Sequence, residues 1–217
     1  MTHKRLVLSI LSMVLLIFLL FGCSSIAADM TPTPDLSIVW TENFEDGDLQ
    51  GWEIISPRDV FYVEEGVLMS GPETGGDILH ESNVSTGTWS FDIYLPEQMS
   101  GVDLFGLVVD QAMNNGFGFD IKNTLENTQI RVTTVEDTQF KYKSQILVPK
   151  AVGWNHMDIT RDEIGNSKFY LNSELILEYK DDLTISPYYI YFTPEILGPT
   201  IDNVFVRNQV MDIQAAE

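Results

Sequence analysis

The sequence predicts an all-β domain, a two-sheet antiparallel sandwich, preceded by a signal peptide and a short linker. Three observations predict it: short segments in which apolar and polar residues alternate, boundaries of Gly, Asn, Asp, Ser or Pro, and no convincing helical period. We divide the chain into a signal peptide (1–22), a cysteine and flexible linker (23–37), the sandwich (38–208) and a C-terminal tail (209–217).

Residues 1–22 have the organisation of an export signal. His3, Lys4 and Arg5 precede an apolar run, Leu6 to Phe21, that is shorter than the roughly 20 residues a membrane-spanning helix needs. The run leads to Cys23, the only cysteine of the chain. Leu20-Phe21-Gly22-Cys23 resembles the lipobox of bacterial and archaeal lipoproteins, which implies a lipid on Cys23 and a location on the extracytoplasmic side of the cell membrane. A secreted protein with a buried cysteine, or an uncleaved anchor, is the alternative.

The charge of the chain limits its partners. It has 12 basic and 32 acidic residues, a net charge of −20, and loss of residues 1–22 would remove Lys4 and Arg5 but no acid. Such a surface repels nucleic acid and anionic lipid headgroups, so we expect no nucleic-acid partner. Divalent cations, calcium above all, suit clustered carboxylates outside the cell, although a plain acidic surface is the alternative.

The segments after the leader are justified in chain order. Residues 24–37 are small and polar with Pro32 and Pro34, which predicts an extended tether. Leu104 to Asp110 is almost continuously apolar, as in a strand buried on both faces. Alternation with period two predicts strands over 89–95, 116–121, 129–135, 155–161, 168–171 and 201–207.

Three segments resemble the concanavalin A-like lectin and glucanase superfamily, which includes laminin G-like modules. They are the opening NFEDGDLQGW (43–52), the hairpin beginning GWNHMDITR (153–161) and the closing IDNVFV (201–206). The resemblance spans Phe44 to Val206 and implies a jelly-roll sandwich whose earliest and latest strands pair.

The resemblance also implies a structural cation. In sugar-binding domains of this kind a calcium ion often bridges the opening and closing strands, which here implies Asp46, Asp48 and Asp202, with Glu45 as a further candidate. The alternative is that Asp46 caps its own turn and Asp202 caps a strand end.

Carbohydrate binding on the concave sheet is the leading functional prediction. Such modules stack exposed aromatic rings on sugars and bind hydroxyls through Asn and Asp side chains. The predicted ligand-binding residues are Tyr189, Tyr191, Trp89, Asp110 and Asn114, with Tyr189 and Tyr191 on one face of their strand. The alternative is that these rings fill the core.

Catalysis has less support in the sequence. Glycosidases of this fold place carboxylates on one face through an E-x-D-x-E strand, and the chain has no such motif. His80 and His156 have no serine or second ligand nearby in sequence, so we interpret both as surface or strand histidines. We therefore predict a non-catalytic, lipid-anchored module that binds polysaccharide or glycan. The alternatives are an enzyme of the 3-keto-disaccharide hydrolase type, which the opening motif also resembles, and a protein-adhesion or structural laminin G-like domain.

Overall fold

A computed structural model describes most of the domain that follows the linker. The described residues all belong to the second of two units, Leu36–Glu217, into which the chain divides. The predicted signal peptide, Cys23 and residues 24–36 of the linker lie outside them. No helix in the described part of the chain is long and apolar enough to cross a membrane. The structure describes residues 37–55, 61–71, 76–99, 103–137, 139–180, 189–193 and 198–213.

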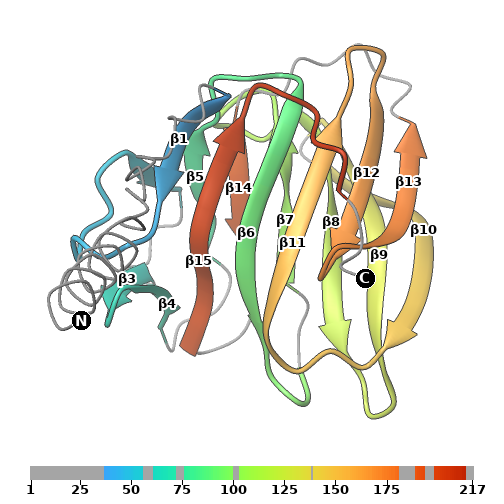
Figure 1. Ribbon diagram of the computed structural model, residues 1–217, viewed down its shortest axis with the longest axis horizontal. Helices are drawn as coiled ribbons and strands as arrows, with labels where there is room; N and C mark the ends of the chain where they lie inside the picture. The colour runs from blue at the N-terminus through green and yellow to red at the C-terminus, as the bar shows by residue number, and fades with distance from the viewer. Residues whose placement is uncertain are drawn as a thin grey trace, which may run out of the picture. The chain divides into compact units, whose positions relative to one another are not determined.

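Sheet A contains eight strands in the order β13-β12-β11-β6-β15-β4-β3, with β1 also paired to β15, and it faces the viewer in Figure 1. Its strands are antiparallel to their neighbours. They are β1 (Ile38–Glu42), β3 (Phe61–Glu64), β4 (Val67–Ser70), β6 (Gly87–Leu95), β11 (Gly153–Arg161), β12 (Asn166–Leu171), β13 (Glu174–Lys180) and β15 (Gly198–Arg207).

Sheet B lies behind sheet A and contains seven antiparallel strands in the order β10-β9-β8-β7-β14-β5-β2 (Figure 1). The strands are β2 (Trp52–Ile54), β5 (Ile78–Glu81), β7 (Asp103–Val108), β8 (Asn115–Asn123), β9 (Asn127–Glu136), β10 (Gln139–Pro149) and β14 (Tyr189–Thr193). The predicted all-β, two-sheet antiparallel sandwich is thereby confirmed.

The earliest and latest described strands pair, as the sequence predicted. Strand β1 runs antiparallel to β15, with Trp40 opposite Val206 and Glu42 opposite Val204. Strand β15 itself lies between β6 and β4 in the middle of sheet A. The last described strand, β15, therefore pairs with β6, β4 and β1, and it joins the two ends of the described domain within sheet A.

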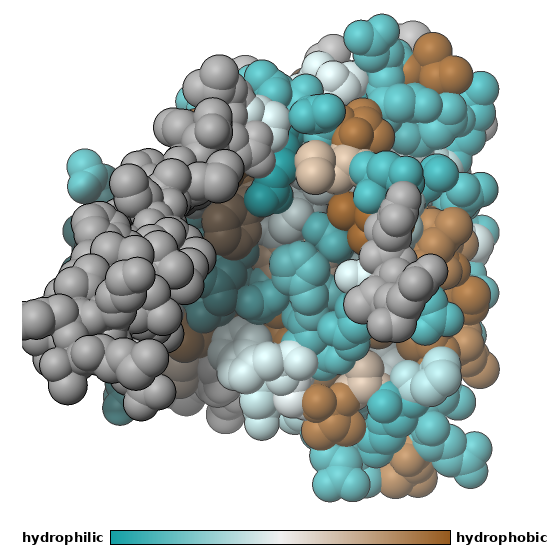
Figure 2. All heavy atoms as spheres, in the orientation of Figure 1, coloured by the Kyte–Doolittle hydropathy of each residue, from teal (hydrophilic) through white to brown (hydrophobic). Residues whose placement is uncertain are grey.

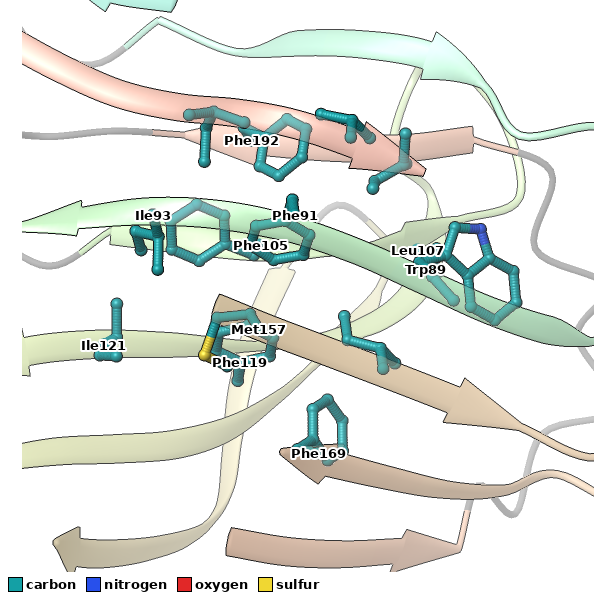
Figure 3. Packing of buried hydrophobic residues seen from close by; sticks show 14 of the residues in the cluster. Trp89, Phe91, Ile93, Phe105, Leu107, Phe119, Ile121, Met157, Phe169 and Phe192 are labelled. Atoms are coloured by element: carbon teal, nitrogen blue, oxygen red, sulfur yellow. The ribbon is translucent and has the colours of Figure 1, made fainter. Parts of the chain in front are cut away.

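The core lies between the inner faces of the two sheets and is rich in phenylalanine (Figure 3). Phe105 of β7 is 5.4 Å from Phe91 of β6, 5.4 Å from Phe119 of β8 and 5.5 Å from Phe192 of β14, measured between ring centroids. All four rings are at most 1% exposed. Burial of such rings supplies much of the free energy that holds two sheets together, about 3–5 kcal/mol for each ring by truncation to alanine.

Trp89 belongs to this core and cannot stack on a ligand, which corrects the sequence-based prediction. It is completely buried, on the same inner face of β6 as Phe91 and Ile93 (Figure 3). Because side chains alternate along a strand, Ser90 and Asp92 point to the outer face instead. The prediction that the rings fill the core is correct at this position.

Candidate functional site

The outer face of sheet B brings together most of the residues predicted to bind sugar. Phe192 of β14 and Phe119 of β8 face the core, so their alternate neighbours along each strand face outward. Tyr191, Leu79 and Val108 form a separate buried cluster there, against which Tyr189 and Met113 pack. Met113 lies in the loop from Asp110 to Asn114, so the structure places both predicted tyrosines next to the predicted loop.

Tyr191 is nevertheless completely buried and Tyr189 is half-buried, so the pair is not the open aromatic platform that the sequence predicted. The reason is the loop after β7, which folds back across β14 and β5. Its Gln111 Nε2 donates a hydrogen bond to Glu53 on β2, the far edge strand of the sheet. Met113 of the same loop packs on the Tyr191 cluster and covers it.

Asp110 and Asn114 maintain the shape of this loop. The Asp110 carboxylate accepts hydrogen bonds from the Asn114 backbone amide at 3.1 Å and from Asn114 Nδ2 at 2.9 Å. Met113 N also donates to Asp110 O, in a turn where Met113 has a φ of 50°. Asp110 and Asn114 therefore hold the cover in place by bonding to each other, which is a different role from the predicted contact with sugar.

Two glycines leave the middle of this face without side chains. Gly106 of β7 lies opposite both Tyr191 of β14 and Gly118 of β8, and Gly118 lies opposite Thr133 of β9. A Cβ atom at Gly106 would lie 2.8 Å from Tyr191 Cε1, so the tyrosine ring covers this glycine. Strands β14 and β9, which carry Tyr191 and Thr133, lie about 14 Å apart. Because the Tyr191 ring covers Gly106, the only position left between the two side chains is Gly118, which has no side chain.

The hydroxyl groups on both sides of this gap are buried and have no hydrogen-bond partner among the described residues. They are Tyr191 Oη and Thr133 Oγ1, and both residues are 0% exposed. Burial, followed by the charges of Asp77 and Asp120, raises the pKa of Tyr191 above its ordinary value, so the phenol stays protonated. Unpaired buried hydroxyls cost about 1–3 kcal/mol each, and such groups call for a partner such as a ligand or water.

A charged pair lies one step further along the same face. Asp120 of β8 is 1% exposed, and Arg131 Nε of β9 donates to its Oδ1 at 2.6 Å. The hydrogen bond to Asp120 raises the pKa of Arg131 above its ordinary value. The guanidinium also stacks on the ring of Tyr142, 4.1 Å from its centroid, and Tyr142 is 59% exposed. We call Tyr191, Thr133, Asp120, Arg131 and Tyr142 the sheet B site.

Sequence reasoning missed most of the sheet B site. A signal was present in GFGFD, where Gly116, Gly118 and Asp120 share one face of the strand while Phe117 and Phe119 share the other. Alternation of glycine with large rings marks a backbone that another group approaches closely. The pairing with Thr133 and Arg131 depends on the register of β8 and β9, which no local pattern specified.

The outer face of sheet A holds His156, whose local sequence indicates only a surface or strand histidine. His156 Nδ1 lies 2.6 Å from Asp92 Oδ1, and its Nε2 lies 3.4 Å from Asp158 Oδ1. Hydrogen bonds to Asp158 and Asp92 raise the pKa of His156 to about 9, so the ring is an imidazolium at neutral pH. A signal for this contact was present in the sequence. His156 and Asp158 lie on one face of their strand, and Ser90 and Asp92 lie on one face of the strand that pairs with it.

The residues predicted to bind calcium lie in two settings. Asp46 Oδ1 accepts from Asp48 N at 3.3 Å and Asp48 Oδ1 accepts from Gln50 N at 2.8 Å, so each carboxylate caps the opening turn. Burial, and then the neighbouring charges of Asp92 and Glu45, raise the pKa of Asp202. Within the described residues, no group of three His, Cys, Asp or Glu side chains could hold a metal ion. Among the predicted residues of the opening turn, Glu45 is the one whose charge raises the pKa of Asp202, so the calcium prediction is applied to this pair.

The comparisons with known proteins agree with this fold. A family model described as the 3-keto-alpha-glucoside-1,2-lyase-like domain matches residues 39–194. No curated protein matches the chain. Solved structures give a likeness of fold alone, because their sequence identities are low. Carbohydrate-binding module CBM66 from Bacillus subtilis is 15% identical, with a TM-score of 0.56 over 70% of this chain and 91% of that one.

Two carbohydrate-related structures have similar scores. Domain 4 of AbnA, a GH43 extracellular arabinanase from Geobacillus stearothermophilus in complex with arabinotriose, is 11% identical, with a TM-score of 0.56 over 81% of this chain and 94% of that one. The Bacillus licheniformis beta-glucanase is 10% identical, with a TM-score of 0.52 over 81% of this chain and 91% of that one. The fold is thus shared by proteins whose names refer to binding and to cleavage of carbohydrate.

We expect the free energy of unfolding to fall as the pH rises through about 9, because His156 then loses its proton. Its pKa in the folded state lies above the ordinary 6.5, so the stabilisation is complete below pH 6.5. The side chain is 42% exposed, and solvent screening reduces the effect to about 1 kcal/mol. Urea unfolding at pH 6.5 and pH 9.5 measures it. His156→Gln should abolish the difference, and an equal difference in that variant would contradict the assignment.

If calcium bridges Glu45 and Asp202, about 5 mM calcium should raise the melting temperature relative to chelator, since extracellular sites bind with dissociation constants near 10⁻⁴–10⁻³ M. Thermal unfolding of the wild type and of Asp202→Asn measures the shift. The variant should melt at one temperature with or without calcium. Asp137→Asn, an exposed acid of the β9–β10 turn, is the control that keeps the shift. A wild-type melting temperature that ignores calcium would remove the bridge.

Proposed function

Since the chain belongs to the 3-keto-alpha-glucoside-1,2-lyase-like domain family, we propose that it is a lipid-anchored domain that binds carbohydrate at the sheet B site without cleaving it. The family concerns glucosides, which supports a carbohydrate-related function. The observation that carries the proposal is the pair of buried hydroxyls, Tyr191 Oη and Thr133 Oγ1, that lack a partner among the described residues. Because Tyr191, Thr133 and Gly118 are all buried, a sugar hydroxyl would give both hydroxyls a partner only after the groups that cover them move away.

The chemistry of the surrounding groups suits a neutral polyol. The protonated phenol of Tyr191 donates a hydrogen bond, Asp120 accepts, and Thr133 can do either. Tyr142, more than half exposed at the rim, offers a ring for the apolar face of a sugar. Few, convergent polar groups beside an aromatic ring are the usual composition of such sites.

Binding is better supported than cleavage by the protonation states at this site. A general acid or base works best with a pKa near the operating pH. The pKa of Tyr191 is displaced upward, away from neutrality, by its burial. Asp120 is paired with Arg131, whose Nε lies 2.6 Å from its Oδ1. The phenol of Tyr191 is therefore not tuned to exchange protons at neutral pH.

Cleavage is the second candidate, because the family description names a 1,2-lyase. Such a reaction removes the proton at C2 and expels the substituent at C1 of a 3-keto-glucoside. Incubation of the full chain with a 3-keto-α-glucoside, followed by chromatography of the products, separates the candidates. Release of the aglycone faster than in a Tyr191→Phe variant would overturn the non-catalytic proposal.

The hydroxyls of the sheet B site should contribute to affinity without contributing to stability. Tyr191→Phe and Thr133→Val should each weaken binding of the best neutral oligosaccharide from a glycan array about fivefold, the value of one hydrogen bond. Each should leave the free energy of unfolding equal or higher, since an unpaired buried hydroxyl is removed. Titration calorimetry and urea unfolding of the detergent-solubilised full chain measure both.

Tyr170→Phe is the matched control for the hydroxyl variants. Tyr170 is also nearly buried, at 6% exposed, but it lies on β12 of sheet A. Its substitution should leave affinity unchanged. Unchanged affinity in both Tyr191→Phe and Thr133→Val would exclude the sheet B site, and weaker binding in Tyr170→Phe would show that the loss is not specific.

The proposed anchor depends on Cys23, outside the described residues. The export signal and the position of this cysteine support it, and two or more acyl chains would give stable attachment. Cys23→Ser should move the protein from the membrane fraction to the soluble extracytoplasmic fraction and abolish labelling by radioactive palmitate. The unsubstituted chain provides the comparison, and a variant that stays labelled and membrane-bound would contradict lipidation at this residue.

A further inference from the structure

The outer face of sheet A has a second arrangement of aromatic and polar groups, on the side of the sandwich away from the sheet B site. Strands β6 and β11 run antiparallel in the middle of this sheet, and their outward residues form successive cross-strand rows. Figure 2, in the orientation of Figure 1, shows hydrophilic residues gathered over the middle of this face. The first three rows pair Trp154 with Tyr94, His156 with Asp92, and Asp158 with Ser90.

The first row is an aromatic surface open to solvent. Trp154 is 45% exposed, whereas the other described tryptophans are buried or half-buried. Its ring lies edge to face with Tyr94, with centroids 5.6 Å apart and planes at 72°. This contact fixes the orientation of the indole while leaving much of it uncovered. An exposed ring that is held in one orientation is suited to stacking on the apolar face of a ligand.

The second and third rows are a rigid polar network. Asp158 accepts a hydrogen bond from Ser90 Oγ at 2.6 Å and contacts His156 Nε2 at 3.4 Å. Asp92 contacts His156 Nδ1 on one oxygen and accepts from Asn203 Nδ2 at 2.9 Å on the other. Each carboxylate is therefore held by two partners; Asp158 is buried, at 4% exposed, and the side chain of Asp92, 28% exposed, is the acceptor that faces solvent in a fixed position. Fixed acceptors lose little conformational entropy when they bind a ligand.

A pocket continues the polar rows. Its volume is about 390 Å³, and it is lined by residues that include Ser90, His156, Asp158, Phe205, Arg207 and Met211. The C-terminal segment forms one wall, held by a hydrogen bond from Met211 N to Thr88 Oγ1 of 2.9 Å. From the Trp154 row to the Ser90 row the face extends about 13 Å, so stacking and hydrogen bonding can engage neighbouring units of one chain-like ligand.

We propose that this face is a second, independent carbohydrate-binding site, in which Trp154 stacks on a neutral sugar ring, and Asp92 and His156, held in place by Asp158, bind the hydroxyls of the neighbouring sugar. A sugar ring matches the arrangement because it has an apolar face and hydroxyls at its edge. An anionic sugar does not match, because the carboxylates of Asp92, Asp158 and Asp202 outnumber the two cations of this face, the imidazolium of His156 and the guanidinium of Arg207. The chain, net charge −20, adds a repulsive field of the same sign.

Two sites on opposite faces would make each domain bivalent. A polysaccharide held by both faces, or by both faces of neighbouring molecules, dissociates more slowly than from either site alone. The second site uses none of the residues of the sheet B site, so either can fail without the other.

The experiment titrates the detergent-solubilised full chain with a neutral oligosaccharide, maltohexaose or the strongest neutral ligand of a glycan array, and with an oligogalacturonide. We expect the neutral sugar to change the tryptophan fluorescence and to bind at two sites per chain. Trp154→Ala should weaken the second site about tenfold and remove the fluorescence change. Tyr62→Ala is the matched control, because Tyr62 is equally exposed, at 45%, but lies on edge strand β3.

The outcomes separate the two sites. A Trp154→Ala variant that keeps two sites and the full fluorescence change overturns the second site, as does the absence of any Trp154-dependent neutral ligand. Tyr191→Phe tests the sheet B site alone and should leave the Trp154 signal intact. An oligogalacturonide is an anionic sugar, so binding as tight as that of the neutral sugar would overturn the proposal that the ligand is neutral. Asp92→Asn, which keeps the size of the side chain but removes one of its two acceptor oxygens, should weaken binding of the neutral ligand and spare Tyr191-dependent binding.

Discussion

The requirement to bury one face of every strand determines the rest of this structure. Phe91 on sheet A and Phe105 on sheet B can exclude water only by packing against each other, which fixes the inner face of both strands. Because side chains alternate, the same requirement directs Asp92 and Gly106 outward. Both candidate sites are therefore by-products of core packing: a change of one residue in register would exchange their side chains with those of the core.

The two outer faces meet this constraint differently. The centre of the outer face of sheet B has no side chains at Gly106 and Gly118, and the loop containing Met113 covers the neighbouring strands. Sheet A keeps its side chains and connects them, with His156 between two carboxylates. The site on sheet B is thus enclosed and has buried hydroxyls without a hydrogen-bond partner among the described residues. The site on sheet A is open to solvent, and its polar side chains bond to one another. Membership of a family named for glucoside chemistry supports the proposal that carbohydrate is the ligand of both arrangements.

The sequence predicted features that depend on local pattern and missed those that depend on tertiary contacts. The two-sheet sandwich and the pairing of β1 with β15 were predicted from alternation and from the opening and closing motifs. Exposure of Tyr191 was predicted wrongly because alternation identifies the outer face but cannot show that a distant loop covers it. Asp120 and Arg131 were missed because their contact depends on the register between two strands. His156 was missed for the same reason, since its partner Asp92 lies on another strand.

The position of β15 has a consequence for the time at which the domain can fold. This strand, the last of the described strands, lies between β6 and β4 rather than at an edge, and it also pairs with β1. Strands β6 and β4 consequently have no strand between them until residues near Arg207 have been synthesised. Contacts between residues this distant in sequence also form slowly. If residues 1–22 direct export as the sequence predicts, this order is useful, because an incomplete sheet can still pass as an extended chain through a translocation channel and the sandwich would close only afterwards.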